Sequence, residues 1–102
     1  MNTQEIINEQ VTTNHIVLYM KGTPESPQCG FSAHAVKILN ACGENNIFAI
    51  DVLSNPEIRQ GIKEYSNWPT IPQLYINGSF IGGSDIVDEM YKNGELQKLI
   101  KQ

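Results

Sequence analysis

The sequence predicts a single α/β domain, spanning residues 1–102, in which a mixed four-stranded sheet is flanked by helices. Two apolar runs at 15–20 and 47–52 enclose a segment with helical periodicity, which indicates a right-handed βαβ unit with parallel strands. Asn77-Gly78 lies between two further apolar runs and is the strongest short-range signal for a two-residue hairpin. The sheet is therefore expected to continue with antiparallel strands.

Composition and charge narrow the classes of function. The formal net charge is -4 and no run of Lys or Arg occurs, so no nucleic-acid partner is predicted. Residues 1–5 lack the features of a signal peptide, and no apolar run approaches membrane-spanning length. We therefore expect a cytoplasmic protein without a membrane partner. Two cysteines, Cys29 and Cys42, are too few for a disulfide framework and are expected to be thiols.

The first part of the chain is predicted to contain a helix, a strand and a loop. Asn2 followed by Glu5 is a plausible helix start with a short apolar stripe behind it. Residues 15–20 are almost continuously apolar, which is typical of a central strand covered on both faces. Residues 21–28 contain two prolines and a glycine among polar residues, which indicates a loop.

The middle of the chain is predicted to be helix, strand and helix. Apolar side chains recur at helical spacing from residue 31 to residue 42, and Gly43 supplies a C-terminal stop. Residues 47–52 are predicted to form a second buried strand. A helix follows at once, because Ser54 or Asn55 can cap it.

The last part is predicted to combine an irregular loop, the hairpin and two helices. Residues 67–72 contain two prolines, which remove backbone donors, so a shaped loop is expected there. After the hairpin, residues 82–85 open a helix that ends at Gly94, before a last short helix. Trp68 could be a core aromatic or part of a surface used for partners, and packing that stiffens the loop is the favoured interpretation.

Cys29 is the residue around which chemistry is expected. It lies at or just before a helix N-terminus, where unpaired N–H groups and the helix dipole favour the thiolate, so it is a candidate nucleophile or metal ligand. Ser32, three residues later, cannot form a disulfide, which makes this a one-thiol site. Cys42 continues an apolar stripe and is predicted to be a small core residue. His15 and His34 have no second ligand at metal spacing and are predicted to be structural or solvated.

Four segments, in this order and at this spacing, resemble the monothiol glutaredoxins, and the resemblance covers nearly the whole chain. They are Tyr19-Met20-Lys21-Gly22, Cys29-Gly30-Phe31-Ser32, Asn67-Trp68-Pro69-Thr70-Ile71-Pro72-Gln73 and Gly82-Gly83-Ser84-Asp85-Ile86. The resemblance implies a thioredoxin-like fold in its glutaredoxin form.

The same resemblance implies a function in iron–sulfur cluster biogenesis and redox homeostasis. That family binds glutathione and holds a [2Fe-2S] cluster between two protomers, with Cys29 as the ligand here. A cluster needs four ligands, so two copies of Cys29 and two glutathione thiolates would complete the set in a cluster-bridged homodimer. BolA-like proteins and apo iron–sulfur proteins are plausible partners by resemblance.

Glutathione contacts are likewise implied by resemblance. Lys21 and Arg59 resemble contacts to the glycyl carboxylate. The backbone of Ile71, before a Pro72 expected to be cis, resembles the segment that pairs with the cysteinyl amide. The further contacts expected are the N–H groups of Ser84 and Asp85 for the γ-glutamyl carboxylate, the Asp85 side chain for its ammonium, and Cys29, Gly30, Phe31, Thr70 and Gly83.

At position 84 the chain departs from many members of the family, and this departure excludes one kind of thiol chemistry. Many relatives carry a second cysteine where this chain has Ser84, so a disulfide between the two positions cannot form. A second hypothesis is a glutathione-dependent thiol–disulfide oxidoreductase, in which Cys29 attacks a mixed disulfide and a second glutathione resolves the adduct. A third is an interaction module with a vestigial thiol. The longer loop after Lys21 favours the cluster carrier by resemblance.

Overall fold

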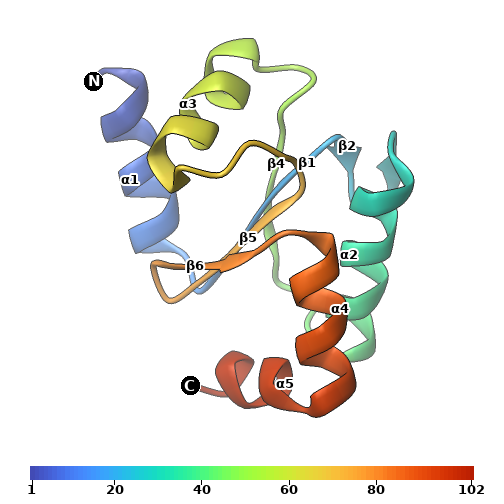
Figure 1. Cartoon of the computed structure of the whole chain (residues 1–102). Coiled ribbons are helices and arrows are strands. Elements are labelled where there is room, and N and C mark those ends of the chain that lie inside the picture. Colours follow the sequence, from blue (N-terminus) through green and yellow to red (C-terminus); the bar gives the residue numbers. More distant parts are fainter.

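A mixed sheet of four strands forms the centre of the computed structural model, which describes residues 1–102 (Figure 1). The helices are α1 (Thr3–Thr13), α2 (Gly30–Ala41), α3 (Pro56–Ser66), α4 (Ser84–Asn93) and α5 (Glu95–Ile100). The strands of the central sheet are β1 (Ile16–Met20), β4 (Phe48–Asp51), β5 (Gln73–Ile76) and β6 (Ser79–Gly82). A second, two-stranded sheet consists of β2 (Gly22–Thr23) and β3 (Ser26–Pro27).

The strand order β4-β1-β5-β6 confirms the mixed topology. β1 pairs in parallel with β4 and antiparallel with β5, and β6 pairs antiparallel with β5. All five residues of β1 are buried, as expected of a central strand. The prediction that β4 is also fully buried was wrong, because β4 lies at the sheet edge. Within it only Ile50 is buried, and Phe48 is 40% exposed.

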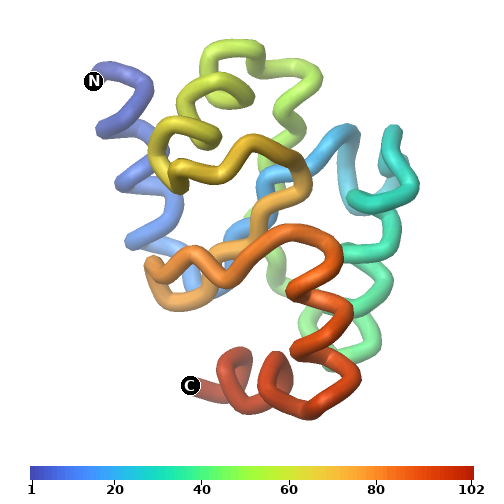
Figure 2. Tube along the Cα trace, in the orientation of Figure 1, coloured from blue at the N-terminus to red at the C-terminus, as the bar shows by residue number.

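Helices cover both faces of the sheet and divide the core into two clusters. Ile16, Leu18 and Met20 of β1 face α2, α4 and α5, whereas Val17 and Tyr19 face α1 and α3. The two layers of helices lie on opposite sides of the strands in Figure 1, and the tube in Figure 2 shows α5 closing the chain beneath α4. Because successive side chains of β1 point to opposite faces of the sheet, this one strand contributes to the core beneath both layers of helices.

Local signals account for some helix ends, although the N-cap residues of α2, α3, α4 and α5 make no side-chain capping hydrogen bond. The Asn2 side chain accepts a hydrogen bond from the Glu5 N–H at 2.9 Å, which confirms the predicted start of α1. At the end of α2, Gly43 has a φ of 81° and stops the helix as predicted. Asn55 is the N-cap residue of α3, but its side chain does not cap the helix, because its amide instead donates to the Asp51 carbonyl at 3.1 Å.

The segment 21–28, predicted to be a loop, forms the small hairpin β2–β3. Gly22 makes this hairpin possible, since its φ is 90° and a Cβ there would lie 2.5 Å from the Ser26 carbonyl oxygen. The Gly22 N–H donates to Asp51 Oδ1 at 2.9 Å, which fastens the hairpin to the end of β4. Strands of two residues carry no periodicity, so the sequence could not predict them.

Two further predictions about the backbone are confirmed. Asn77 and Gly78 both have positive φ, 52° and 82°, as a tight hairpin between β5 and β6 requires. The Ile71–Pro72 peptide bond is cis. No helix combines the length and the apolar character that crossing a membrane requires.

Candidate functional site

A cavity of about 460 Å³ opens where α2 and α4 begin, beside α3 and the loop 67–72. It brings together ten of the eleven predicted site residues from five separate parts of the chain. They are Lys21, Cys29, Phe31, Arg59, Thr70, Ile71, Pro72, Gly83, Ser84 and Asp85. Gly30, the remaining one, lines a smaller neighbouring depression that shares Cys29 and Phe31 with this cavity.

Cys29 is the N-cap residue of α2 and is partly exposed at this cavity. The Ser32 N–H lowers the pKa of the Cys29 thiol most, and the Phe31 N–H, the Lys21 charge and the Ser32 hydroxyl lower it further; partial burial opposes them. Cys29 is therefore more nucleophilic, and a better metal ligand, at neutral pH than an ordinary cysteine.

Cations gather at one end of the cavity. Lys21 follows the end of β1 and Arg59 lies partly buried on α3, and both line the cavity as the sequence predicted. Lys63 also lines the cavity and was missed, although it lies four residues after Arg59 and therefore on the same helix face. None of the three forms an ion pair within the chain, which leaves them free for an anionic ligand.

The other end of the cavity is the start of α4. Gly83 is its N-cap residue and has no side chain to bond the first N–H groups of the helix. These N–H groups and the helix dipole favour an anion there. The Asp85 carboxylate lies in the same lining and has no cationic partner within the chain. The arrangement therefore suits a ligand group that carries both a carboxylate and an ammonium.

The loop 67–72 forms the wall between these two ends. The backbone N–H and C=O of Ile71 make no hydrogen bond within the chain. Gly83 approaches this wall closely, since a Cβ there would lie 3.4 Å from the Pro72 carbonyl oxygen. Trp68 packs on Phe80 with ring centroids 6.1 Å apart, which confirms its predicted packing. The loop therefore offers an unpaired strip of backbone to a ligand.

Three large apolar side chains line the cavity yet remain exposed. Phe31 is 63% exposed, Trp68 38% and Ile86 36%. They come from the first turn of α2, the loop 67–72 and the first turn of α4. An apolar rim around a reactive thiol is a surface onto which another molecule can dock.

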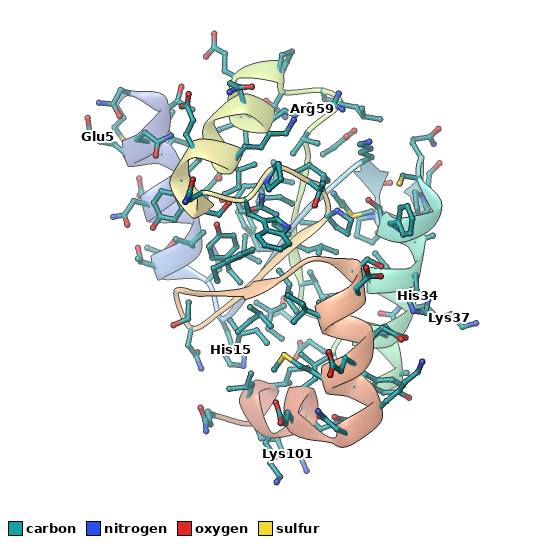
Figure 3. The ribbon with its side chains drawn as sticks, in the orientation of Figure 1. Glu5, His15, His34, Lys37, Arg59 and Lys101 are labelled. Atoms are coloured by element: carbon teal, nitrogen blue, oxygen red, sulfur yellow. The ribbon has the colours of Figure 1, made fainter.

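His34 lies beside the smaller depression next to Cys29. Its Nε2 lies 2.9 Å from Asp88 Oδ1, and Lys92 Nζ lies 2.9 Å from the other oxygen of the same carboxylate. These two partners, Lys92 first, hold the pKa of Asp88 below its usual range. Figure 3 shows His34 on α2 near α4, whereas Lys37 points away from the molecule. His34 thus joins two helices, in keeping with the structural role predicted for it.

Cys42 lies at the opposite end of α2 from Cys29. It packs against the core below the helix, as its periodicity predicted, and burial raises the pKa of its thiol. The rise per residue of an α-helix separates the two cysteines by roughly 20 Å. They cannot ligate one metal centre together.

Comparisons with known proteins assign this arrangement to a family. The family model described as glutaredoxin matches residues 16–81, which is more than half of the chain. The chain belongs to the glutaredoxin family. This glutaredoxin is 57% identical to a protein of Synechocystis sp. named as an uncharacterized monothiol glutaredoxin, ycf64-like, over 97% of this chain and 92% of that protein. It is 55% identical to glutaredoxin 4 of Escherichia coli, over 98% of this chain and 86% of that protein.

A solved structure confirms the predicted fold. The solution structure of reduced poplar apo GrxS14 superposes with a TM-score of 0.83 at 48% identity, covering 96% of this chain and 89% of that one. The thioredoxin-like fold and the resemblance to the monothiol glutaredoxins are therefore confirmed. Glutaredoxins typically bind glutathione. Its two carboxylates and its ammonium complement the cations at one end of the cavity and the helix start with Asp85 at the other.

Proposed function

We propose that this glutaredoxin binds glutathione and carries a [2Fe-2S] cluster as cargo between two protomers, for delivery to apo iron–sulfur proteins. The observation that carries the proposal is the position of Cys29. One partly exposed thiol of lowered pKa lies in a cavity that has unpaired cations at one end and a helix N-terminus at the other. Such a site offers one metal ligand and a place for a second thiol beside it.

Glutathione matches the cavity group by group. Its glycyl carboxylate suits Lys21 and Arg59, with Lys63 as a third cation on the same side. Its cysteinyl amide can pair with the free backbone of Ile71. Its γ-glutamyl group suits the start of α4, where the Asp85 carboxylate can accept from the ammonium.

The remaining cavity residues form the walls around the tripeptide. They are Phe31, Thr70, Pro72, Gly83 and Ser84, with Gly30 in the neighbouring depression. A tripeptide held at both ends in this way has its own thiol in the middle. That thiol would lie beside Cys29.

The number of ligands argues for two protomers. No group of three or more His, Cys, Asp or Glu side chains in the chain could hold a metal ion. Cys29 is the one thiol at the cavity, and Cys42 is roughly 20 Å away along α2. Two Cys29 thiolates and two glutathione thiolates supply the four ligands that a cluster takes. The exposed Phe31 beside each Cys29 gives the two protomers an apolar contact.

The role of a cluster carrier also suggests how the cluster is released and which partners receive it. A cluster held at the molecular surface by one protein ligand per protomer can leave by ligand exchange, as a carrier requires. We propose a cytoplasmic protein that contributes to redox homeostasis, with BolA-like proteins and apo iron–sulfur proteins as partners. The absence of basic runs argues against a nucleic-acid partner.

The lowered pKa of Cys29 also supports a second function, a glutathione-dependent thiol–disulfide oxidoreductase. The Cys29 thiolate would attack the glutathione sulfur of a mixed disulfide, forming a new S–S bond and expelling the substrate as a thiolate. A second glutathione thiolate would then attack this adduct, giving glutathione disulfide and the free Cys29 thiolate. Neither step needs a second protein cysteine.

Anaerobic reconstitution with iron and sulfide tests the proposal, with glutathione present or omitted. The expected result is a [2Fe-2S] absorption and circular dichroism spectrum on a dimer by size-exclusion chromatography, which requires glutathione and is lost in Cys29→Ser. Cys42→Ser is the matched control and should retain the cluster. A colourless monomer that still reduces a glutathione mixed disulfide would favour the oxidoreductase, and a protein with neither property would favour an interaction module.

A further inference from the structure

Gln73 is a polar side chain in the core that the proposed function does not use. It is the first residue of β5, directly after Pro72, and it is fully buried. A buried amide destabilises the fold unless all its donors and acceptors find partners. Its partners therefore show what this residue does.

Both ends of the Gln73 amide are occupied. Nε2 donates to the Trp68 carbonyl at 3.0 Å and to the Thr70 carbonyl at 3.2 Å. Oε1 accepts from the Tyr75 hydroxyl at 3.3 Å. Two carbonyl acceptors on one side settle the orientation of the amide, because the flipped form would place Oε1 against both of them.

The start of the loop beside the cavity is held by the Trp68 N–H, which donates to the Lys63 carbonyl at 3.1 Å, but residues 69–72 have no backbone hydrogen bond of their own. Pro69 and Pro72 have no N–H, and Thr70 and Ile71 make no backbone hydrogen bond within the chain. Gln73 itself is anchored, since it belongs to a strand and lies opposite Tyr19 of the central strand β1. Gln73, which is fixed in the strand, therefore holds the Trp68 and Thr70 carbonyls of the loop that forms the cavity wall.

We infer that Gln73 is a positioning residue for glutathione: its amide fixes the Trp68 and Thr70 carbonyls so that the unpaired backbone of Ile71 lies where the tripeptide's peptide group can bind. This inference rests on the proposed binding of glutathione. Gln73 does not touch the ligand and acts only through the loop. A side chain of the same size without the two donors would leave the fold in place and the wall unsupported.

Two variants of similar size test the inference. Gln73→Met removes both donors, and Gln73→Glu replaces the amide nitrogen with an oxygen that faces two carbonyls. Titration calorimetry with reduced glutathione, below the melting temperature of each variant, should give a dissociation constant about tenfold above that of the unmodified protein. Hydrogen exchange at the Trp68 amide, which donates to the Lys63 carbonyl at 3.1 Å, should become faster, while the amides of β1 keep their protection.

The pH dependence distinguishes positioning from a general loss of stability. Protonation of the introduced carboxyl restores one donor, so the affinity of Gln73→Glu should recover as the pH falls, and that of Gln73→Met should not, after both are referred to the unmodified protein. Leu96→Ala is the matched control, because Leu96 is fully buried in α5, outside the cavity lining. It should lower the melting temperature and leave the glutathione affinity unchanged.

Each outcome bears on one claim. If the unmodified protein binds no glutathione, the proposed function fails. If it binds glutathione and both Gln73 variants bind equally well, or if Leu96→Ala weakens binding as much as they do, the inference is overturned. Should neither Gln73 variant fold, Tyr75→Phe removes only the hydroxyl that donates to Oε1, and it should raise the dissociation constant about twofold to fivefold; an unchanged value would contradict the inference.

Discussion

The hydroxyl oxygen of Ser32 accepts a hydrogen bond from the backbone N–H of Lys21 at 3.0 Å. This bond joins the end of β1 to the first turn of α2, and Ser32 is fully buried to make it. The same hydroxyl also lowers the pKa of Cys29. The residue that rules out a disulfide here therefore anchors the helix that carries the thiol and stabilises its thiolate.

Ser32→Ala should raise the pH at which Cys29 reacts. The hydroxyl is lost and the Lys21 N–H loses its acceptor, although the largest contribution, from the backbone N–H of residue 32, remains. The rise should be small, because the hydroxyl lowers the pKa of Cys29 less than the Ser32 N–H, the Phe31 N–H and the Lys21 charge do. The rate of alkylation by iodoacetamide, followed across pH by mass spectrometry of the Cys29 peptide, measures this.

Cys42 provides an internal control in that experiment. Burial raises the pKa of its thiol, so it should react at higher pH than Cys29 and should not respond to Ser32→Ala. An unchanged alkylation profile for Cys29 in the variant would show that the hydroxyl does not act on the thiolate.

Removing a cavity cation should weaken glutathione binding. Lys21→Ala and Arg59→Ala are each expected to cost about 1–3 kcal/mol of binding free energy, the range for hydrogen bonds to charged groups. Lys63→Ala should weaken binding as well, because Lys63 lines the same end of the cavity. Titration calorimetry at low ionic strength measures all three.

Lys37→Ala is the matched control for these variants. Lys37 is exposed on α2, outside the cavity lining, and points away from the molecule (Figure 3). It removes the same charge and should leave the affinity unchanged. Equal losses for Lys37→Ala and Arg59→Ala would indicate an effect of net charge and remove Arg59 from the site.

The sequence predicted those parts of the fold whose signals are local. An almost continuous apolar run predicted β1, an Asn-Gly pair predicted the β5–β6 turn, and a side-chain acceptor at Asn2 predicted the start of α1. The exposure of β4 could not be predicted in the same way, because strand order depends on contacts between distant segments. Phe48 is a large apolar residue of the kind found in buried strands, yet it lies in the edge strand β4 and is 40% exposed.

The site shows the same division. Helical spacing from Arg59 would have identified Lys63, so that omission was avoidable. Gln73 was different, since a glutamine that starts a strand gives no sign that its amide turns back to hold two loop carbonyls. Contacts of that kind depend on the path of the loop, which sequence periodicity does not describe.

Gly82→Ala and Gly30→Ala should have opposite effects on stability. At Gly82, φ is 154° and a Cβ would lie 2.8 Å from Cβ of Ile86, so the first turn of α4 must shift, at a cost of about 1–3 kcal/mol. At Gly30, the first residue of α2, a Cβ meets nothing within 4 Å. Alanine there should stabilise the fold by about 0.4–1 kcal/mol, since it restricts the unfolded chain. Urea unfolding measures both.

A higher free energy of unfolding for Gly82→Ala, or one lowered by several kcal/mol for Gly30→Ala, would contradict the predicted effects of a Cβ at these two positions. Ser79→Ala is a suitable reference, because Ser79 is exposed on β6 and its side chain makes no hydrogen bond within the chain. Its free energy of unfolding should stay close to that of the unmodified protein.

His15 should make stability depend on pH. Its Nε2 lies 2.7 Å from the Ile100 carbonyl oxygen, and its Nδ1 lies 2.6 Å from Asn77 Oδ1, so it joins α5 to the hairpin turn. Both partners are acceptors, so the protonated ring can donate to both. The Ile100 carbonyl raises the pKa of His15 above its ordinary value of 6.5 most, followed by Asn77, and the charge of Glu44 adds a smaller increase.

A raised pKa in the folded state means that the protonated ring favours folding. The stabilisation is fully present below pH 6.5 and is lost as the pH rises through the higher pKa of the folded protein. The ring is exposed at the surface, so solvent screening limits the effect to about 0.5 kcal/mol. His15→Gln keeps a polar side chain that does not titrate, and every other residue is the same in both proteins. The difference in free energy of unfolding between the unmodified protein and His15→Gln should therefore shrink from about pH 5.5 to about pH 8. A constant difference across that range would show that the two hydrogen bonds do not depend on the charge of the ring.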